Sequence, residues 1–281
     1  MLTSVFMGYI FDAEDARRYE EWLADEKNRA ALDLEMRLMK SMLRPVCGES
    51  LLDIGCGTGE SIKAYLGKGI NLTGIDPSGA MLAIAKEKLG HRVDFHRGFA
   101  EDLPFPDNAF DHASLFLTLE FAKNPDEAIA EACRVAKDSV FIGILNRYSA
   151  YVTHLRISAY FKPSIYNHAR FFSIGEVKQM IFRQLGQVPV FWKTALQFPG
   201  STRGRCYRLE TGGYLENNPF GAFAGIKAIP VPRFQAMPLA LKTRAEIKAA
   251  AGNRVASCRR YNGEAAGAQS GGNAQKQPPN R

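Results

Sequence analysis

The sequence predicts an α/β fold, a doubly wound and mostly parallel sheet of seven strands with helices on both faces. Three observations support it. Short apolar strands alternate with amphipathic helices through residues 50–145, which is the pattern of a parallel sheet. Three alternating glycines follow the first strand at once, and missing side chains let backbone approach a ligand closely. Two further apolar runs, near residues 190 and 225, bring the strand count to seven.

The first element is a helix over 11–44, because apolar residues recur with helical spacing between charges until Pro45 and Gly48 end it. The strands expected next are 50–54, 70–75, 92–96, 110–117 and 139–145. The helices between them are 60–66, 79–89 and 124–137, the last capped by Asn124 with Pro125 at its first position. Crossovers between parallel strands are right-handed, so the strands are expected to form a doubly wound sheet. In such a sheet a ligand should lie beyond the carboxyl ends of the strands.

The pattern loosens after Asn146. Residues 148–170 are aromatic and basic without a clear period. A capping box at Ser173–Glu176 opens a helix that ends at Gly186. The last strands are expected at 188–196 and 220–229.

The charge distribution divides the chain. The net charge is +7, but 229–281 hold nine basic residues and two acidic ones, a net of +7, so 1–228 sum to zero. The basic character thus belongs to the C-terminal segment, and no specific nucleic-acid partner is expected. We predict a helical cap over 1–44, a catalytic domain over 45–229 and a basic, largely disordered tail over 230–281.

Several classes of protein are disfavoured. No run of 18 apolar residues occurs, so no transmembrane segment is expected. The first residues lack the basic start of a signal peptide. The five cysteines and five histidines show no metal-ligand spacing, and an odd number of scattered cysteines argues against a disulfide framework. We therefore expect a cytoplasmic protein without a metal; its oligomeric state stays open.

The motif that carries most chemistry is Asp53-Ile54-Gly55-Cys56-Gly57-Thr58-Gly59. A dinucleotide fingerprint has the spacing GxGxxG, and its third glycine would fall on Glu60, whose carboxylate would repel a pyrophosphate. An acid ahead of the glycines, Asp53, suits a ligand with an ammonium group instead. A tight turn without a ligand is the plain structural alternative.

Two further stretches complete the pattern. Asp76 ends the second strand, where a carboxylate can accept hydrogen bonds from both hydroxyls of a ribose, although Asp-Pro also makes a good turn. The loop over 98–111 leads into the fourth strand, and its backbone could contact an adenine edge. An ordinary loop is the alternative there.

These stretches, which read LLDIGCGTGE, GIDPSGAML and GFAEDLPFPDNAFD, resemble the class I methyltransferases. More closely, the chain is similar to the methyltransferase-type-11 domain of the ubiquinone- and menaquinone-biosynthesis-like group. The resemblance covers about 45–145, and more loosely 9–228. It implies a Rossmann-like fold, S-adenosylmethionine as cofactor and a methyltransferase activity.

The resemblance also implies roles for individual residues. Asp53 and the loop after it would hold the methionine part of the cofactor; the loop comprises Gly55, Cys56, Gly57, Thr58 and Gly59. Asp76 would hold the ribose, with Pro77 and Met81 against the adenine. Ala100 would meet the adenine through its backbone. The family often has Asp before that alanine, where this chain has Phe99, so either Glu101 or Asp102 substitutes or that contact is lost.

Methyl transfer needs chiefly alignment of an acceptor lone pair and removal of water, and a base only where the acceptor must lose a proton. The candidates for contact with the acceptor are Glu120, Asn146, Tyr166 and His168, although a lone polar residue at a strand end usually serves the local structure. Tyr19 and Trp22 could cover the cofactor or pack in the core. The aromatic segment over 148–172 favours a small, partly hydrophobic acceptor.

Two other functions remain open at this point. One is a nucleotide-binding protein of Rossmann type without methyl transfer, which Glu60 disfavours. The other is a nucleic-acid methyltransferase. The uncharged folded part disfavours it, and so does the sequence Thr118-Leu119-Glu120-Phe121 where an Asn-Pro-Pro-aromatic motif would stand.

Overall fold

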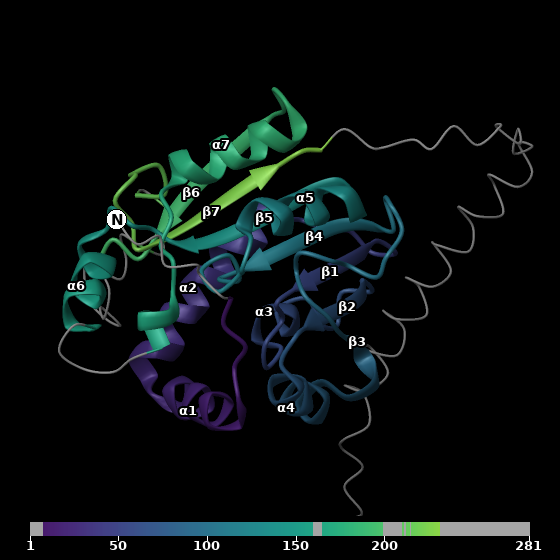
Figure 1. The fold of residues 1–281 in the computed structure, drawn as a ribbon, viewed down its shortest axis with the longest axis horizontal. Coiled ribbons are helices and arrows are strands. Elements are labelled where there is room, and N and C mark those ends of the chain that lie inside the picture. Colours follow the sequence, from purple (N-terminus) through teal and green to yellow (C-terminus); the bar gives the residue numbers. More distant parts are fainter. Residues whose placement is uncertain (1–7, 160–164, 199–209, 211, 214, 231–281) are drawn as a thin grey trace, which may run out of the picture.

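The structure is a computed structural model, and it describes residues 8–159, 165–198, 210, 212–213 and 215–230. The predicted tail therefore lies outside the described residues, apart from residue 230. One central sheet runs through the described part, with helices packed on both of its faces (Figure 1).

The sheet has seven strands in the order β3-β2-β1-β4-β5-β7-β6. Strands β1 to β5 pair in parallel, and β7 runs antiparallel between β5 and β6. The prediction of a doubly wound, mostly parallel seven-stranded sheet is confirmed. The strands are β1 (Ser50–Ile54), β2 (Asn71–Asp76), β3 (Asp94–Arg97), β4 (Phe110–Phe116), β5 (Ala136–Leu145), β6 (Val190–Ala195) and β7 (Phe223–Ala228).

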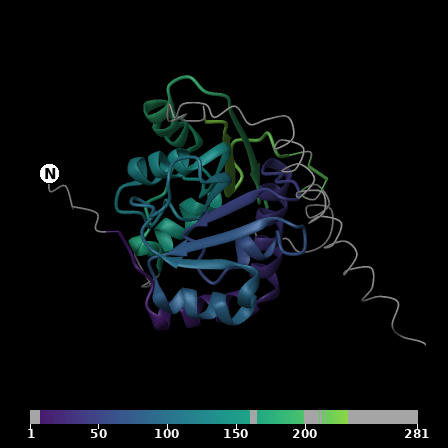
Figure 2. The ribbon, with the colours of Figure 1, turned by 90° about the vertical axis from the view of Figure 1, so that its right-hand side faces the viewer.

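Two helical layers bury the two faces of the sheet, and Figure 2 shows them on either side of it. Helices α5 (Pro125–Val135) and α7 (Ile174–Leu185) pack on one face and enclose a core of aliphatic residues. On the other face lie α2 (Glu26–Met42), α3 (Glu60–Lys63) and α4 (Gly79–Leu89). Each helix turns its apolar side inward, as its sequence period requires.

The predicted helix over 11–44 is wrong in one respect: it is two helices, α1 (Ala13–Ala24) and α2. Asp25 separates them. Its side chain accepts hydrogen bonds from the backbone N–H groups of Lys27 and Asn28, so it caps α2 and ends α1. The break lets α1 fold back over the carboxyl ends of the strands and contact α4.

The segment without a clear period also contains helical structure, namely α6 (Ala150–Ala159) and a 3₁₀ turn, η2 (Ile165–His168). A second 3₁₀ turn, η1 (Gly90–Arg92), follows α4. Only Val152 of α6 is fully buried, which is why no apolar stripe was visible. Strand β5 begins at Ala136, directly after α5.

Ion pairs link α1, α2, α3 and α4 to one another. Lys88 of α4 contacts Glu20 of α1 at 2.6 Å and Glu60 of α3 at 2.9 Å. Arg29 of α2 contacts the other oxygen of Glu60 at 2.9 Å. Glu60 is 8% exposed, so these contacts are better shielded from water than a surface pair. They fix α1 and α2 relative to the glycine-rich turn.

Within the described residues, no helix is long and apolar enough to cross a membrane. Cys47, which precedes β1, is disulfide-bonded. The scattered cysteines did not predict this bond, because cysteine spacing in sequence does not report distance in the fold.

Candidate active site

A cavity of about 1310 Å³ lies beyond the carboxyl ends of β1 to β5, where the strand order predicts a ligand site. The loops after these strands form its floor, and α1, α2, α6 and η2 contribute the walls. Nine of the eleven predicted cofactor residues line it: Gly55, Cys56, Gly57, Thr58, Asp76, Pro77, Met81, Ala100 and Glu101. Asp53 and Gly59 do not.

The glycine-rich turn is tied to the neighbouring strand. The N–H groups of Gly55 and Cys56 both donate to the carbonyl of Ile75, at 2.7 and 3.1 Å. Gly55 has φ +73°, and a Cβ there would lie 2.4 Å from the side chain of Thr118. Gly57 has φ +51° and faces open space. Gly55 is thus required by packing, whereas Gly57 leaves the cavity free for a ligand.

Asp76 is both a turn residue and a wall of the cavity. Its Oδ2 accepts a hydrogen bond from the Gly57 N–H at 2.9 Å, and its Oδ1 accepts one from the Ser78 N–H at 2.8 Å. Burial raises the pKa of this carboxyl, and the two hydrogen bonds oppose that effect. A carboxylate has about four acceptor positions, so two stay available to hydroxyl groups in the cavity.

Asp53 lies behind the turn rather than in the cavity. It is 1% exposed, and its oxygens accept hydrogen bonds from the hydroxyls of Ser61 and Ser114. Burial raises its pKa to about 6. The predicted direct contact of Asp53 with an ammonium group stays a prediction, because Asp53 does not line the cavity. Instead, Asp53 joins β1, β4 and α3 beneath the turn.

Pro77, Met81 and Ala100 line the cavity together, on the side of β2 and β3. Phe99, which departs from the family pattern, is 53% exposed and also lines it. The Glu101 carboxylate accepts a hydrogen bond from the Asn124 N–H at 3.1 Å, so it is anchored to the start of α5. Asp102 lines the cavity as well.

An extended segment, residues 8–12, crosses the cavity before α1 begins. The Tyr9 N–H donates to the Phe121 carbonyl at 2.9 Å, and the Ser78 hydroxyl donates to the Phe11 carbonyl at 2.6 Å. The Phe11 and Phe121 rings meet edge to face with centroids 5.0 Å apart. Tyr19 and Trp22 of α1 also face the cavity. The N-terminal part of the chain therefore forms a wall of the site, in addition to its packing on the core.

The four residues proposed for contact with the acceptor have different positions. Glu120 and Tyr166 line the cavity. The Asn146 amide donates to the carbonyls of Pro219 and Gly221, at 2.7 and 3.0 Å, so this side chain holds the loop before β7. His168 is exposed, and its ring stacks on Tyr9 at 4.4 Å. These contacts favour the alternative for Asn146 and His168, namely that each side chain serves the local structure.

Glu120 is enclosed, with 1% of its surface exposed. Its Oε1 accepts a hydrogen bond from the Leu145 N–H at 2.7 Å, and its Oε2 has no hydrogen-bond partner among the described residues. Burial raises the pKa of Glu120 to about 7.

Glu35 of α2, which was not predicted as a site residue, is 6% exposed and lines the same cavity. Burial, followed by the negative charge of Glu120, raises its pKa to about 8. A signal was present, because Glu35 interrupts the apolar stripe formed by Leu32, Met36 and Met39. Tyr151 of α6, equally unexpected, lines the cavity too.

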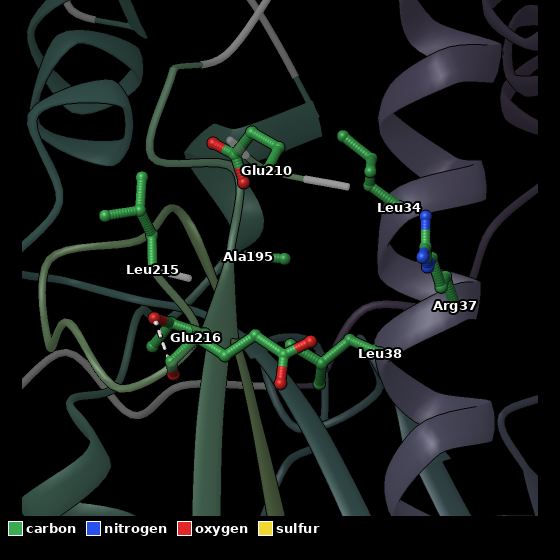
Figure 3. Close-up of a pocket in the computed structure, with 8 residues that line it drawn as sticks. Leu34, Arg37, Leu38, Ala195, Glu210, Leu215 and Glu216 are labelled. Atoms are coloured by element: carbon green, nitrogen blue, oxygen red, sulfur yellow. Dashed lines mark hydrogen bonds between the residues drawn. The ribbon is translucent and has the colours of Figure 1, made fainter. Parts of the chain in front are cut away.

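Two other features do not form comparable sites. A pocket between α2 and β6 has a volume of about 20 Å³, which fits little more than one water molecule; Figure 3 shows Leu34, Arg37 and Leu38 facing Glu210 and Glu216 there. At the opposite end of the sheet, Glu49, His112 and Asp138 come together. The His112 nitrogens already contact the Ser139 hydroxyl at 2.8 Å and Glu49 at 3.0 Å, which accounts for that cluster without a metal.

The strand order, the glycine turn on β1 and the acidic residue at the end of β2 together define a class I methyltransferase architecture. The comparisons with known proteins agree: the chain belongs to the class I S-adenosylmethionine-dependent methyltransferases, and S-adenosylmethionine is its cofactor. Residues 52–144 match the family described as "Methyltransferase domain".

Three similar proteins illustrate the range of the class. An uncharacterized protein of Methanocaldococcus jannaschii is 35% identical over 179 residues, which are 63% of this chain and 80% of that protein. A demethylmenaquinone methyltransferase of Renibacterium salmoninarum is 36% identical over 101 residues, 36% of this chain and 42% of the relative, so the match spans less than half of its length. A Thermotoga maritima structure, described as a methyltransferase and possible histamine N-methyltransferase, has a TM-score of 0.64 and 25% identity; the match covers 77% of this chain and 96% of that one.

Proposed function

We propose that this methyltransferase transfers the methyl group of S-adenosylmethionine to a small, partly hydrophobic molecule, and that both bind in the cavity beyond the carboxyl ends of the strands. The observation that carries the proposal is the size of this cavity together with its two sides, one polar and one apolar. Its volume of about 1310 Å³ exceeds the roughly 300–1,000 Å³ of a pocket for one drug-sized ligand. Polar backbone and Asp76 line the side of β1 and β2, whereas apolar side chains line the side of β4 and β5.

The residues on the side of β1 and β2 fit the cofactor. Gly57 leaves open space above the turn, and Asp76 keeps acceptor positions for the two ribose hydroxyls. Pro77, Met81 and the backbone of Ala100 would enclose the adenine. When bound, the cofactor supplies a methyl group that is already activated on a sulfonium. In this proposal Asp53 positions the turn from behind instead of touching the methionine part.

The other side of the cavity suits an acceptor with apolar parts. Phe116, Leu117, Leu145, Leu196 and Ala222 line it, from the ends of β4, β5 and β6 and the loop before β7. Two of the similar proteins are named for demethylmenaquinone and, as a possibility, histamine. Both compounds are small organic molecules, which supports an acceptor of that kind.

We further propose that 45–229 form the catalytic domain and that the helical cap of 1–44 closes it. The cap covers the cavity through Phe11, Tyr19 and Trp22. Removal of water from two aligned reactants supplies much of the rate in a transfer that needs no covalent intermediate on the protein.

Calorimetry on the full chain tests the cofactor side. S-adenosylmethionine and S-adenosylhomocysteine should bind with micromolar affinity, and NAD should not. Labelled cofactor in a cell extract then identifies the acceptor by the fraction that gains label. Binding of NAD without S-adenosylmethionine would contradict the proposal, and label found only in nucleic acid would contradict the small-molecule acceptor.

A further inference from the structure

Two carboxylates share the acceptor side of the cavity without a counter-ion from the described residues. Glu35 enters from α2 and Glu120 from the loop after β4, and both are almost fully buried. The basic residues of the lining are Arg18, Lys27 and Lys123, and none of them forms an ion pair with either carboxylate. Buried carboxylates are normally paired, so the described residues lack the group that this pair requires.

Glu120 carries the observation that points most directly to a ligand. Its Oε2 is buried in the wall of the cavity and has no hydrogen-bond partner in the part of the chain that the structure describes, while its Oε1 is held by the Leu145 N–H. An ionised carboxylate only accepts hydrogen bonds. A partner for the ionised form is therefore a hydrogen-bond donor, and a positively charged donor would offset the burial of both acids.

Three tyrosines share the cavity with the pair. Tyr19 of α1, Tyr151 of α6 and Tyr166 of η2 line it; burial raises the pKa of all three hydroxyls, and the charge of Glu35 adds to this effect. These tyrosines therefore stay neutral near pH 7, where Glu35 and Glu120 titrate. Glu60 of α3 is neutralised by Lys88 and Arg29. Neutral aromatic faces beside carboxylates are the usual surroundings of a bound organic cation.

The pair lies away from the proposed cofactor side. Asp76 ends β2, whereas Glu120 is bonded to Leu145 at the end of β5, three strands further along the order β2-β1-β4-β5. Neighbouring strands are about 4.8 Å apart, so the two positions are separated by roughly 14 Å along the edge of the sheet. This places the carboxylates where the acceptor would bind.

We propose that the acceptor is an amine with an apolar part, which binds as an ammonium ion between Glu35 and Glu120. The proposal rests on the proposed function above and specifies the chemical class of its acceptor. The apolar part would contact Leu145, Leu196 and Ala222, and the tyrosine rings would lie around the charged nitrogen.

The same carboxylates can take up the proton that must leave. An ammonium nitrogen has no lone pair, so one N–H proton moves to a carboxylate oxygen, for which the unpartnered Oε2 of Glu120 is placed. The freed lone pair then forms the N–C bond as the C–S bond breaks. The electron pair of the C–S bond remains on sulfur. The products are a methylated ammonium ion and S-adenosylhomocysteine.

Calorimetry with the full chain and saturating S-adenosylhomocysteine tests the proposal. The probes are three matched sets, each an amine, its alcohol and its carboxylic acid: the phenethyl, butyl and hexyl compounds. We expect at least one amine to bind tenfold or more tightly than its alcohol, and no acid to bind. Glu120→Gln and Glu35→Gln should each weaken that amine at least tenfold. Glu87→Gln, which removes a charge from the exposed side of α4, serves as the control and should not.

Three results distinguish the possible failures. If no amine binds more tightly than its alcohol while S-adenosylhomocysteine binds, the amine proposal is wrong and the proposed function stands. If S-adenosylhomocysteine does not bind, the proposed function itself fails. If the two glutamine variants weaken S-adenosylmethionine but not S-adenosylhomocysteine or any amine, the pair serves the sulfonium, which also overturns the proposal. Both variants remove a buried negative charge, so their folding should not suffer.

Discussion

Replacement of Asp76 by alanine tests whether this residue holds the cofactor or only the turn. The structure gives it two hydrogen bonds, from the N–H groups of Gly57 and Ser78. Hydrogen bonds to a charged group contribute about 1.5–3 kcal/mol each. Water from the cavity can replace part of this, and the variant is relieved of a buried charge. We therefore expect the free energy of unfolding to fall by about 1–3 kcal/mol. This is less than the sum of the two hydrogen bonds, because water and the removal of a buried charge both offset their loss.

The affinity for the cofactor should fall as well. If two ribose hydroxyls bind the free acceptor positions of Asp76, their loss should weaken S-adenosylhomocysteine about tenfold to a hundredfold, at about 1.4 kcal/mol per decade. For a domain of this size, about 1–3 kcal/mol lowers the melting temperature by roughly 2–12 °C. Thermal unfolding and calorimetry on the same preparation measure the two effects separately.

A matched control separates affinity from stability. Ser50 lies at the opposite end of β1, where its hydroxyl donates to Asp111 at 2.7 Å. Ser50→Ala should lower the melting temperature without a change in cofactor affinity per folded molecule. If Asp76→Ala behaves like Ser50→Ala, with lower stability and unchanged affinity, Asp76 is a turn residue and its assignment to the ribose is refuted.

Three further predictions follow from buried groups and the glycine turn. Between about pH 5 and 8 the ligand-free protein should become less stable as the pH rises, because the pKa values of Glu35, Glu120 and Asp53 are raised in the fold to about 8, 7 and 6; Glu35→Gln should reduce the slope of a melting-temperature profile, most clearly between pH 7 and 8, and an unchanged profile would contradict the raised pKa of Glu35. Gly55→Ala should lower the melting temperature more than Gly57→Ala, since its Cβ would meet Thr118, whereas Gly57→Ala should chiefly weaken S-adenosylhomocysteine; equal effects in both assays would refute the distinction. Asn146→Ala should cost about 1–3 kcal/mol in stability through the two freed carbonyls, and a large loss of methyl transfer per folded molecule would restore it as a catalytic candidate.

The cofactor side could be predicted because its signals are local. The turn after β1 needs glycines within five consecutive positions, and Asp76 ends the next strand. The acceptor side could not be predicted in the same way. Glu120 and Asn146 look alike in sequence, each a polar residue that follows a strand. The loop before β7, more than 70 residues further along the chain, occupies the Asn146 amide and leaves Glu120 free to face the cavity.

Glu35 is instructive for the same reason. In the sequence of α2 it is one of several charged residues. Only the fold places it in the cavity that Glu120 also lines. The break at Asp25 was also hidden, because the apolar spacing continues across it while the cap acts on two backbone N–H groups. The spacing of apolar residues alone indicates which side of a helix is buried, but it does not indicate where the helix ends.

The position of β7 inside the sheet has a consequence for synthesis on the ribosome. Strands β1 to β5 emerge in an order that lets each pair with a neighbour already made, but β6 emerges before the strand that joins it to the sheet. Until residue 228 has left the ribosome, β5 presents an open edge and β6 has no partner. Translation at about 5–20 residues per second makes this interval last seconds. Unpaired strand edges recruit other chains, so aggregation and chaperone binding are favoured while β7 is still missing.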